Sequence, residues 1–422
     1  MAVETEIQQA MAQTDSLWRD FEALCRFGGR FCGSDSEKEA VAYLKDQLET
    51  AFPGQWESLP MVFDGWRRTG QTLERLTPTA EPLDCHALVW SPETPGGGLE
   101  AEVVDLGRGT PDEIHEAAET VRGRIILVRH EYMFSPDTVH RRAKYDAARE
   151  HGAVGFLIGY HLPGDLLATG SSGRNGAADI PAAAITMEAA EALRTAGDEY
   201  PRVRLAIETS TPDDVAESLI VDLPGRSDEW VVLSAHIDGH PLGESAIDNA
   251  TGLAAVLAVG QVMAPHMASM QRGLRLCLFN LEEWALTGSG RYVDALSPEE
   301  RNAIVLNVNL DSIAGDRRLT ALTSGFAKIE GFLSRIAVDT GTDLDFYRPL
   351  MRNSDHYNFA RHDIPAFRLV AGFDDAASAL RYVLTSEDRI DKIDSGDLAA
   401  AASLTASIVL EACRTPSLNL RD

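Results

Sequence analysis

The stretch HIDGHPLGESAIDNATG, from His236 to Gly252, gathers side chains that could bind a metal ion. His236 and Asp238 open this stretch, and Asp248 comes near its end, just before an apolar segment. Taken singly, each is weak evidence, because a histidine at a strand end is often hydrogen-bonded scaffolding and Asp248 could serve only as a helix N-cap. A metal ion would account for the residues together, and it would need further ligands from elsewhere in the chain.

Two further acidic positions follow apolar runs downstream. Glu282 and Glu283 come directly after LRLCLFNL, and Asp311 comes directly after AIVLNVNL. An unpaired buried carboxylate is costly, and a cation held between such groups removes that cost. Imidazole and carboxylate ligands without thiolate suit zinc, manganese or cobalt in a catalytic site. One of the two adjacent glutamates can then bind metal while its neighbour acts as a general base.

The segments before these residues have the character of buried parallel strands. WVVLSAHID, LRLCLFNLEE, AIVLNVNLD and IPAFRLVAG are near-continuous apolar runs, as expected for strands covered on both faces. Open α/β sheets bind ligands outside the carboxyl ends of their strands. We therefore expect His236, Glu282 and Asp311 to meet at one sheet edge. Asp238 is expected on the same strand face as His236, where it would accept the ring N–H.

The rest of the chain suggests two domains. The first fifty residues have a helical pattern, with Ser34 or Asp35 as the cap of SDSEKEAVAYLKDQLETAF. From about His86 to Ser210, short apolar strands alternate with glycine-rich turns and one alanine-rich helix. We predict an α/β protein in which residues 1–85 and 211–422 form a mostly parallel twisted sheet flanked by helices. Residues 86–210 are predicted to form an inserted β-rich domain.

The composition is that of a soluble globular protein, with 44% hydrophobic and 24% charged residues among 422. A net charge of -27 argues against nucleic acid or an anionic membrane as partner. We expect no signal peptide and no membrane span. The scattered cysteines, without CxxC spacing, predict reduced and buried thiols. These features favour a cytoplasmic protein and leave a homo-oligomer open.

Several motifs, in this order, resemble the di-zinc exopeptidases of the aminopeptidase Y and bacterial leucyl aminopeptidase type. They read AHID, AIDNATG, NLEEWALTGSGRYV, NVNLDSIAG and SDHYNF, with FGGRFCGSDSEKEA near the N-terminus. Glutaminyl cyclases and glutamate carboxypeptidase share that catalytic fold. The block 86–210 resembles the protease-associated (PA) domain that several of these enzymes carry. The resemblance implies a zinc exopeptidase fold with a PA-like insert.

The resemblance also implies a role for each matching residue. The implied set comprises first-metal ligands His236 and Asp311, a bridging ligand Asp248, a second-metal ligand Glu283, a general base Glu282, and Asp238 as the acid supporting the first histidine.

The family's fifth ligand, a histidine in a segment resembling HTxxDxxDKI, is missing. This chain reads RYVLTSEDRIDKID there, and Leu384 takes the place of the histidine. Three outcomes are open. His240 or His356 could replace the lost ligand. The second site could instead be empty, leaving one zinc, manganese or iron ion in an oxygen-rich set. Finally, the site could be inactive, although a retained Glu282 argues against decay.

Three residues around SDHYNF are candidates for substrate contact. His356 is either a ligand or substrate contact, or a hydrogen-bonded residue of the pocket wall. Arg348 and Arg352, in RPLMRNSDH, could bind a substrate carboxylate as forks. Arginines of this kind more often form surface pairs.

The leading hypothesis is a metal-dependent hydrolase of a C–N bond, aminopeptidase-like and acting on small peptides, with Glu282 as the base. A second is a dedicated amidohydrolase or aminohydrolase for one small molecule, such as an aromatic compound with a carboxylate; the altered metal site and the nearby arginines suggest it. A third is a binding protein that has lost catalysis, which only Leu384 supports. Glutaminyl cyclisation is disfavoured, because such enzymes usually lack the inserted domain.

Overall fold

The computed structural model describes residues 2–13, 15–172, 179–194 and 199–421, and the contacts divide the chain into two units. The first unit contains residues 1–63, 215–383 and 388–422, and the second contains 64–214 and 384–387. The sequence placed the insert at 86–210. The second unit begins earlier because β2 (Arg67–Arg75) pairs antiparallel with β9 (Arg202–Ser210) and so belongs with it.

Eight strands form the sheet of the first unit. In spatial order they are β1 (Trp56–Asp64), β10 (Asp213–Leu223), β12 (Gly273–Phe279), β11 (Trp230–His236), β13 (Ile304–Leu310), β16 (Ala366–Ala371), β14 (Leu319–Leu322) and β15 (Leu344–Tyr347). The four central strands, β12, β11, β13 and β16, run parallel, and β10 and β14 flank them antiparallel. The expected mostly parallel sheet is confirmed.

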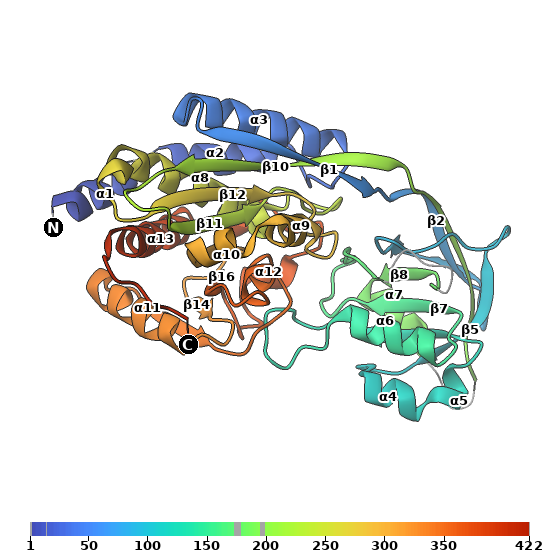
Figure 1. Cartoon of the computed structure of the whole chain (residues 1–422). Helices are drawn as coiled ribbons and strands as arrows, with labels where there is room; N and C mark the ends of the chain where they lie inside the picture. Colours follow the sequence, from blue (N-terminus) through green and yellow to red (C-terminus); the bar gives the residue numbers. More distant parts are fainter. Residues whose placement is uncertain (1, 14, 173–178, 195–198, 422) are drawn as a thin grey trace. The chain divides into compact units, whose positions relative to one another are not determined.

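Helices cover both faces of this sheet, and the strand order explains why. The connection from β11 to β12 carries α8 (Thr251–Met263), whereas the connection from β12 to β13 carries α9 (Thr287–Ala295) and α10 (Pro298–Ala303). The two connections cross the sheet in opposite directions, and right-handed crossovers therefore place their helices on opposite faces. Figure 1 shows α8 above β11 and α10 below it.

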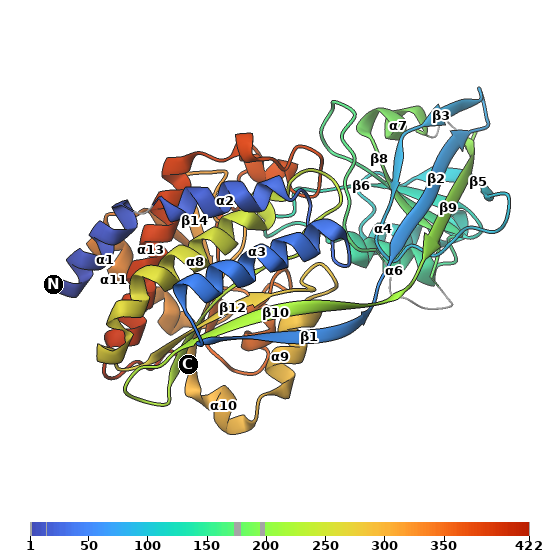
Figure 2. The same ribbon diagram turned by 90° about the horizontal axis from the view of Figure 1, so that it is seen from above.

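The remaining helices complete these layers. They are α1 (Ala2–Gln13), α2 (Ser16–Arg26), α3 (Asp35–Ala51), α11 (Ala327–Thr340), α12 (His356–Ala360) and α13 (Ser395–Arg414). α1, α2 and α13 pack with α8, and Figure 2 shows α2 beside α8. Ser34 caps α3 by accepting a hydrogen bond from the backbone N–H of Glu37 at 3.3 Å, which confirms one of the two predicted caps.

Two apolar helical stretches lie in the core of this unit. Ala246–Ser269 and Ser395–Arg414 have the length and composition of membrane-crossing helices, but most of each is buried inside the fold. Burial of this kind is typical of core helices.

Eight strands from the described residues form the sheet of the second unit. In spatial order they are β3 (Glu81–Leu83), β2, β9, β5 (Leu99–Asp105), β6 (Ile125–Arg129), β7 (Gly155–Gly159), β8 (Ala182–Ile185) and β4 (Cys85–Ala87). β5 to β8 are parallel, and the others pair antiparallel. In the described part of this unit they are accompanied by the helices α4 (Pro111–Glu116), α5 (Ala118–Val121), α6 (Arg141–Glu150) and α7 (Met187–Ala192).

The five cysteines match the expectation of reduced and buried thiols. Cys25, Cys32, Cys85, Cys277 and Cys413 are all buried, and none forms a disulfide. Burial raises the pKa of the Cys85 thiol to about 12, so it stays protonated at neutral pH.

Candidate active site

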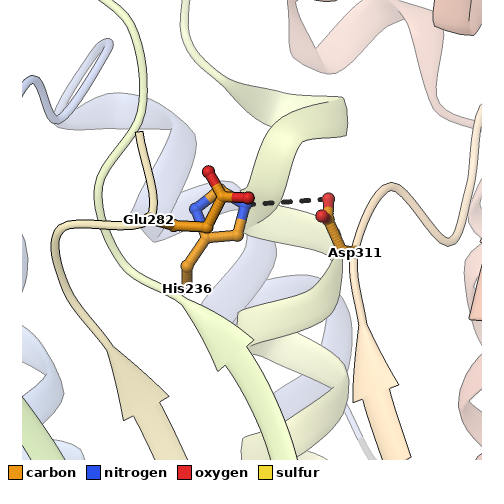
Figure 3. Close-up of side chains that lie close together, drawn as sticks. All are labelled: His236, Glu282 and Asp311. Atoms are coloured by element: carbon orange, nitrogen blue, oxygen red, sulfur yellow. Dashed lines mark ion pairs between the residues drawn. The ribbon is translucent and has the colours of Figure 1, made fainter. Parts of the chain in front are cut away.

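Three neighbouring parallel strands bring the predicted ligands to one sheet edge. β11 ends at His236, Glu282 follows β12, and Asp311 follows β13 directly. Because these strands are adjacent and parallel, their carboxyl ends lie together. Figure 3 shows the three side chains converging from the strand ends. One ligand atom from each lies within 4.8 Å of the other two.

The hydrogen bonding of His236 fixes which ring nitrogen is available to a metal. Nδ1 lies 2.9 Å from the backbone carbonyl oxygen of Asp238. A carbonyl can only accept a hydrogen bond, so Nδ1 carries a proton and Nε2 is the ring nitrogen left for a metal. Nε2 lies 2.9 Å from Oδ1 of Asp248 and 3.6 Å from Oδ1 of Asp311. This orientation is typical of a metal-binding imidazole.

The predicted role of the Asp238 carboxylate was wrong. Its Oδ1 lies 3.8 Å from Nδ1 of His236, beyond hydrogen-bonding distance. The carboxylate instead accepts the backbone N–H groups of Glu282 and Glu283, each at 3.0 Å. β11 already ends at His236, so the alternation of side chains along a strand no longer governs Asp238. Asp238 therefore positions the two glutamates.

A second group of ligand atoms lies at the same edge. It consists of His240, Asp248 and Glu283, whose ligand atoms all lie within 4.8 Å of one another. Asp248 is not the cap of α8, because that helix begins at Thr251 and its N-cap is Ala250. The Asp248 carboxylate contacts His236 instead.

Two polar side chains that the sequence analysis gave no role hold the Asp248 segment. Asp388 accepts the backbone N–H of Ile247 at 2.6 Å and that of Asp248 at 3.3 Å. Asn249 donates from Nδ2 to the backbone oxygen of Leu310, the last residue of β13, at 2.8 Å. The segment that carries Asp248 is therefore hydrogen-bonded both to Asp388, in the C-terminal part of the chain, and to the end of β13, which Asp311 follows.

Arg368 is a further residue that the sequence analysis missed. It lies on β16 with its side chain buried, and Nη2 is 3.2 Å from Oδ1 of Asp311. Its Nη1 donates to the backbone oxygen of Asn353 at 2.8 Å. The signal was present, since an arginine interrupts the apolar run IPAFRLVAG. A buried arginine in such a strand needs a carboxylate partner.

The site holds an excess of buried acid. Burial raises the pKa of Asp238 to about 6 and that of Asp355 to about 7, and it raises the pKa of Glu282 well above its usual range. For Asp311, burial also favours the neutral form, but the positive charge of Arg368 and the contacts with His236 and Ser354 together outweigh burial and lower the pKa.

The same excess of acid acts on His236. Burial lowers its pKa, but the negative charge of Glu282 and the contacts with Asp248 and Asp311 raise it further than burial lowers it. Buried carboxylates around an imidazole favour a positive charge among them. The donor set therefore fits a divalent metal ion.

The other predicted residues lie outside these two groups. His356 is fully buried, neither ring nitrogen has a hydrogen-bond partner among the described residues, and burial lowers its pKa to about 3. Arg348 forms a surface pair with Glu330, with NH2 and Oε2 2.6 Å apart. Arg352 lies over the ring of Tyr357, 5.4 Å from its centroid. Leu384 belongs to the second unit, where its carbonyl accepts the N–H of Thr169 at 2.8 Å.

Comparison with known families agrees with this architecture. Residues 218–409 match the model of peptidase family M28, and residues 99–193 match the PA domain. The first range contains every ligand of both groups. These two stretches of the chain are therefore similar to peptidase family M28 and to the PA domain, in the order that the motifs indicated.

Individual relatives are more distant. Carboxypeptidase Q from Xenopus laevis is 25% identical over 290 residues, which cover 65% of this chain and 61% of that protein. Among solved structures, a peptidase M28 precursor from Shewanella amazonensis has a TM-score of 0.82 at 22% identity, covering 100% of this chain and 98% of its own. A zinc aminopeptidase from Bacillus subtilis has a TM-score of 0.74 at 21% identity, covering 99% and 97%. At these identities the two structures show the fold.

Proposed function

We propose that this chain is a zinc-dependent hydrolase that cleaves the C–N bond of small peptides. The observation that carries this proposal is the convergence of His236, Glu282 and Asp311 from three adjacent strand ends. The match of residues 218–409 to peptidase family M28 and the similarity to peptidases support the same chemistry.

Zinc is the proposed metal for the group around His236. Nε2 of His236, together with carboxylate oxygens of Asp248 and Asp311, offers nitrogen and oxygen donors, which zinc binds readily. One solved structure of the same fold is described as a zinc aminopeptidase. Manganese or iron would also accept an oxygen-rich set, and elemental analysis of protein purified without chelator separates these metals.

A divalent ion bound here supplies Lewis acidity, which polarises a carbonyl group and lowers the pKa of water. Glu282 is the residue placed to move the proton. It takes a proton from the attacking water and returns it to the leaving amine nitrogen as the C–N bond breaks.

The structure also allows a different role for Glu282, as a ligand beside His236 and Asp311. Glu282→Gln separates the two roles. If Glu282 is the base, we expect turnover to fall about 10²- to 10⁴-fold while the metal content stays the same. Loss of metal together with turnover would reassign Glu282 as a ligand, and full activity would remove it from the mechanism. Glu57→Gln, an exposed position on β1, is the matched control.

We propose that the substrate is a small peptide with a free amino terminus. The names of similar proteins include both an aminopeptidase and a carboxypeptidase, so the end that is attacked needs a direct test. Aminoacyl p-nitroanilides should be hydrolysed, and the same compounds with an acetylated amino group should not. Cleavage of only one aromatic amide or amine in a broad panel would instead favour a dedicated amidohydrolase.

A further inference from the structure

The second group of ligand atoms has the composition of a metal site in its own right. His240 and Glu283 form an ion pair through Nε2 and Oε1, and Oδ2 of Asp248 lies 4.0 Å from the same Nε2. The His240 side chain is 2% exposed and the two carboxylates are 13% exposed each. One imidazole and two carboxylates that are almost removed from water form a set that favours a cation.

Asp248 is shared between the two groups. Its Oδ1 lies 2.9 Å from Nε2 of His236, and its Oδ2 lies 4.0 Å from Nε2 of His240. The two oxygens of one carboxylate therefore face two different histidines. This arrangement suits a carboxylate that bridges two neighbouring ions.

The loop that carries His240 is held by hydrogen bonds from a buried arginine. Arg30 is fully buried, and its guanidinium donates to the backbone oxygens of Ile237 at 2.9 Å, Glu244 at 3.0 Å and Ser245 at 2.8 Å. These carbonyls lie on both sides of His240 in the sequence. A rigid guanidinium fork thus closes the loop around the histidine.

Two closer contacts fix the backbone of His240 itself. Its N–H donates to Oγ of Ser245 at 3.0 Å. Its carbonyl oxygen packs so tightly against Gly29 that a Cβ added there would lie 1.6 Å away. Only glycine allows this approach. The position of His240 is therefore determined by the fold, as a ligand position must be.

We propose that His240 supplies the imidazole of a second divalent-ion site, together with Asp248 and Glu283. It does so in place of the histidine that the family motif carries and that this chain replaces with Leu384. The proposal rests on the proposed function, because it concerns a second ion beside the one at His236. His240 reaches the site from the β11–α8 loop, whereas the lost ligand belonged to a segment far downstream.

Metal stoichiometry tests this proposal independently of activity. Protein purified without chelator and loaded with zinc should hold two ions per chain, and His240→Gln should hold one. Loss of a residue that only hydrogen-bonds to a metal ligand lowers metal affinity about 10- to 100-fold. Because His240→Gln removes a direct ligand, the affinity for the second ion should fall at least that far. His362→Gln is the matched control, because it removes a surface histidine–carboxylate pair with Asp294 and should leave both ions bound.

A titration with Co²⁺, followed by its visible absorption, gives a second readout. The spectrum of the native protein should change up to two equivalents and that of His240→Gln up to one. If His240→Gln does not fold, Glu283→Gln should lose the same ion. One ion in the native protein, or two in His240→Gln, would overturn the role of His240 while leaving a metal hydrolase intact. A native protein that binds no metal would overturn the proposed function itself.

Discussion

Asp238 offers a sharp test of how the site is positioned, because its carboxylate holds two functional residues at once. It accepts the backbone N–H groups of Glu282 and Glu283 at 3.0 Å each. In Asp238→Asn one oxygen remains, but the new amide group brings N–H donors towards one of these N–H groups. A buried N–H without an acceptor costs about 1–3 kcal/mol. That energy corresponds to about 5- to 150-fold in an equilibrium constant.

We therefore expect Asp238→Asn to weaken metal binding by about 10- to 100-fold, the range typical of a lost outer-shell partner. Competition with a chromophoric chelator measures this affinity, and kcat/KM should fall at least as far because Glu282 is displaced too. Asp222→Asn is the control, since it removes a half-exposed carboxylate paired with Arg275 at 2.6 Å. Unchanged metal affinity with an intact fold would refute the positioning role of Asp238.

Two further predictions concern other contacts of the first unit. Burial raises the pKa of Glu37 to about 7, so its charged form opposes folding increasingly as pH rises from about 4.5 to 7. The Tm of Glu37→Gln minus that of the native protein should therefore be more positive at pH 8 than at pH 5. The opposite trend in calorimetry would contradict this prediction. Gly29→Ala should displace the backbone of His240 and remove the second ion, as measured by elemental analysis. Gly331→Ala, where an added Cβ meets nothing within 4 Å, should leave the second ion bound. Equal metal content in the two variants would show that the loop can change its conformation to accommodate the added Cβ.

The positions of the strand-end residues could be predicted from sequence because they depend on simple rules. Continuous apolar runs identified β11, β12 and β13, and the edge rule for open α/β sheets placed His236, Glu282 and Asp311 together. These inferences use only the character of each segment. They do not require knowledge of contacts between distant side chains.

The contacts that hold the site were not predictable in this way. The hydrogen bonds of Asp238 depend on where β11 ends and where the chain leaves β12. The clamp by Arg30 joins residues about two hundred positions apart, and only its unusual burial reveals it. Arg368 could have been suspected from its place in an apolar strand, but its partner Asp311 could not be chosen from several acids.

The boundary of the inserted unit shows the same limit. The sequence texture changes near His86, but the contacts place the start of the second unit at Asp64. β2 has few fully buried residues, so its composition gives little signal of a strand. Its membership follows from long-range pairing with β9.

Anomalous diffraction at the zinc edge, from crystals of the zinc-loaded protein, would locate the bound ions directly. We expect one peak among His236, Asp248 and Asp311, and a second among His240, Asp248 and Glu283. A single peak at the first position would leave a one-metal hydrolase and reject the second site. Zinc bound only elsewhere, with the strand-end carboxylates free of metal, would contradict both proposed metal sites.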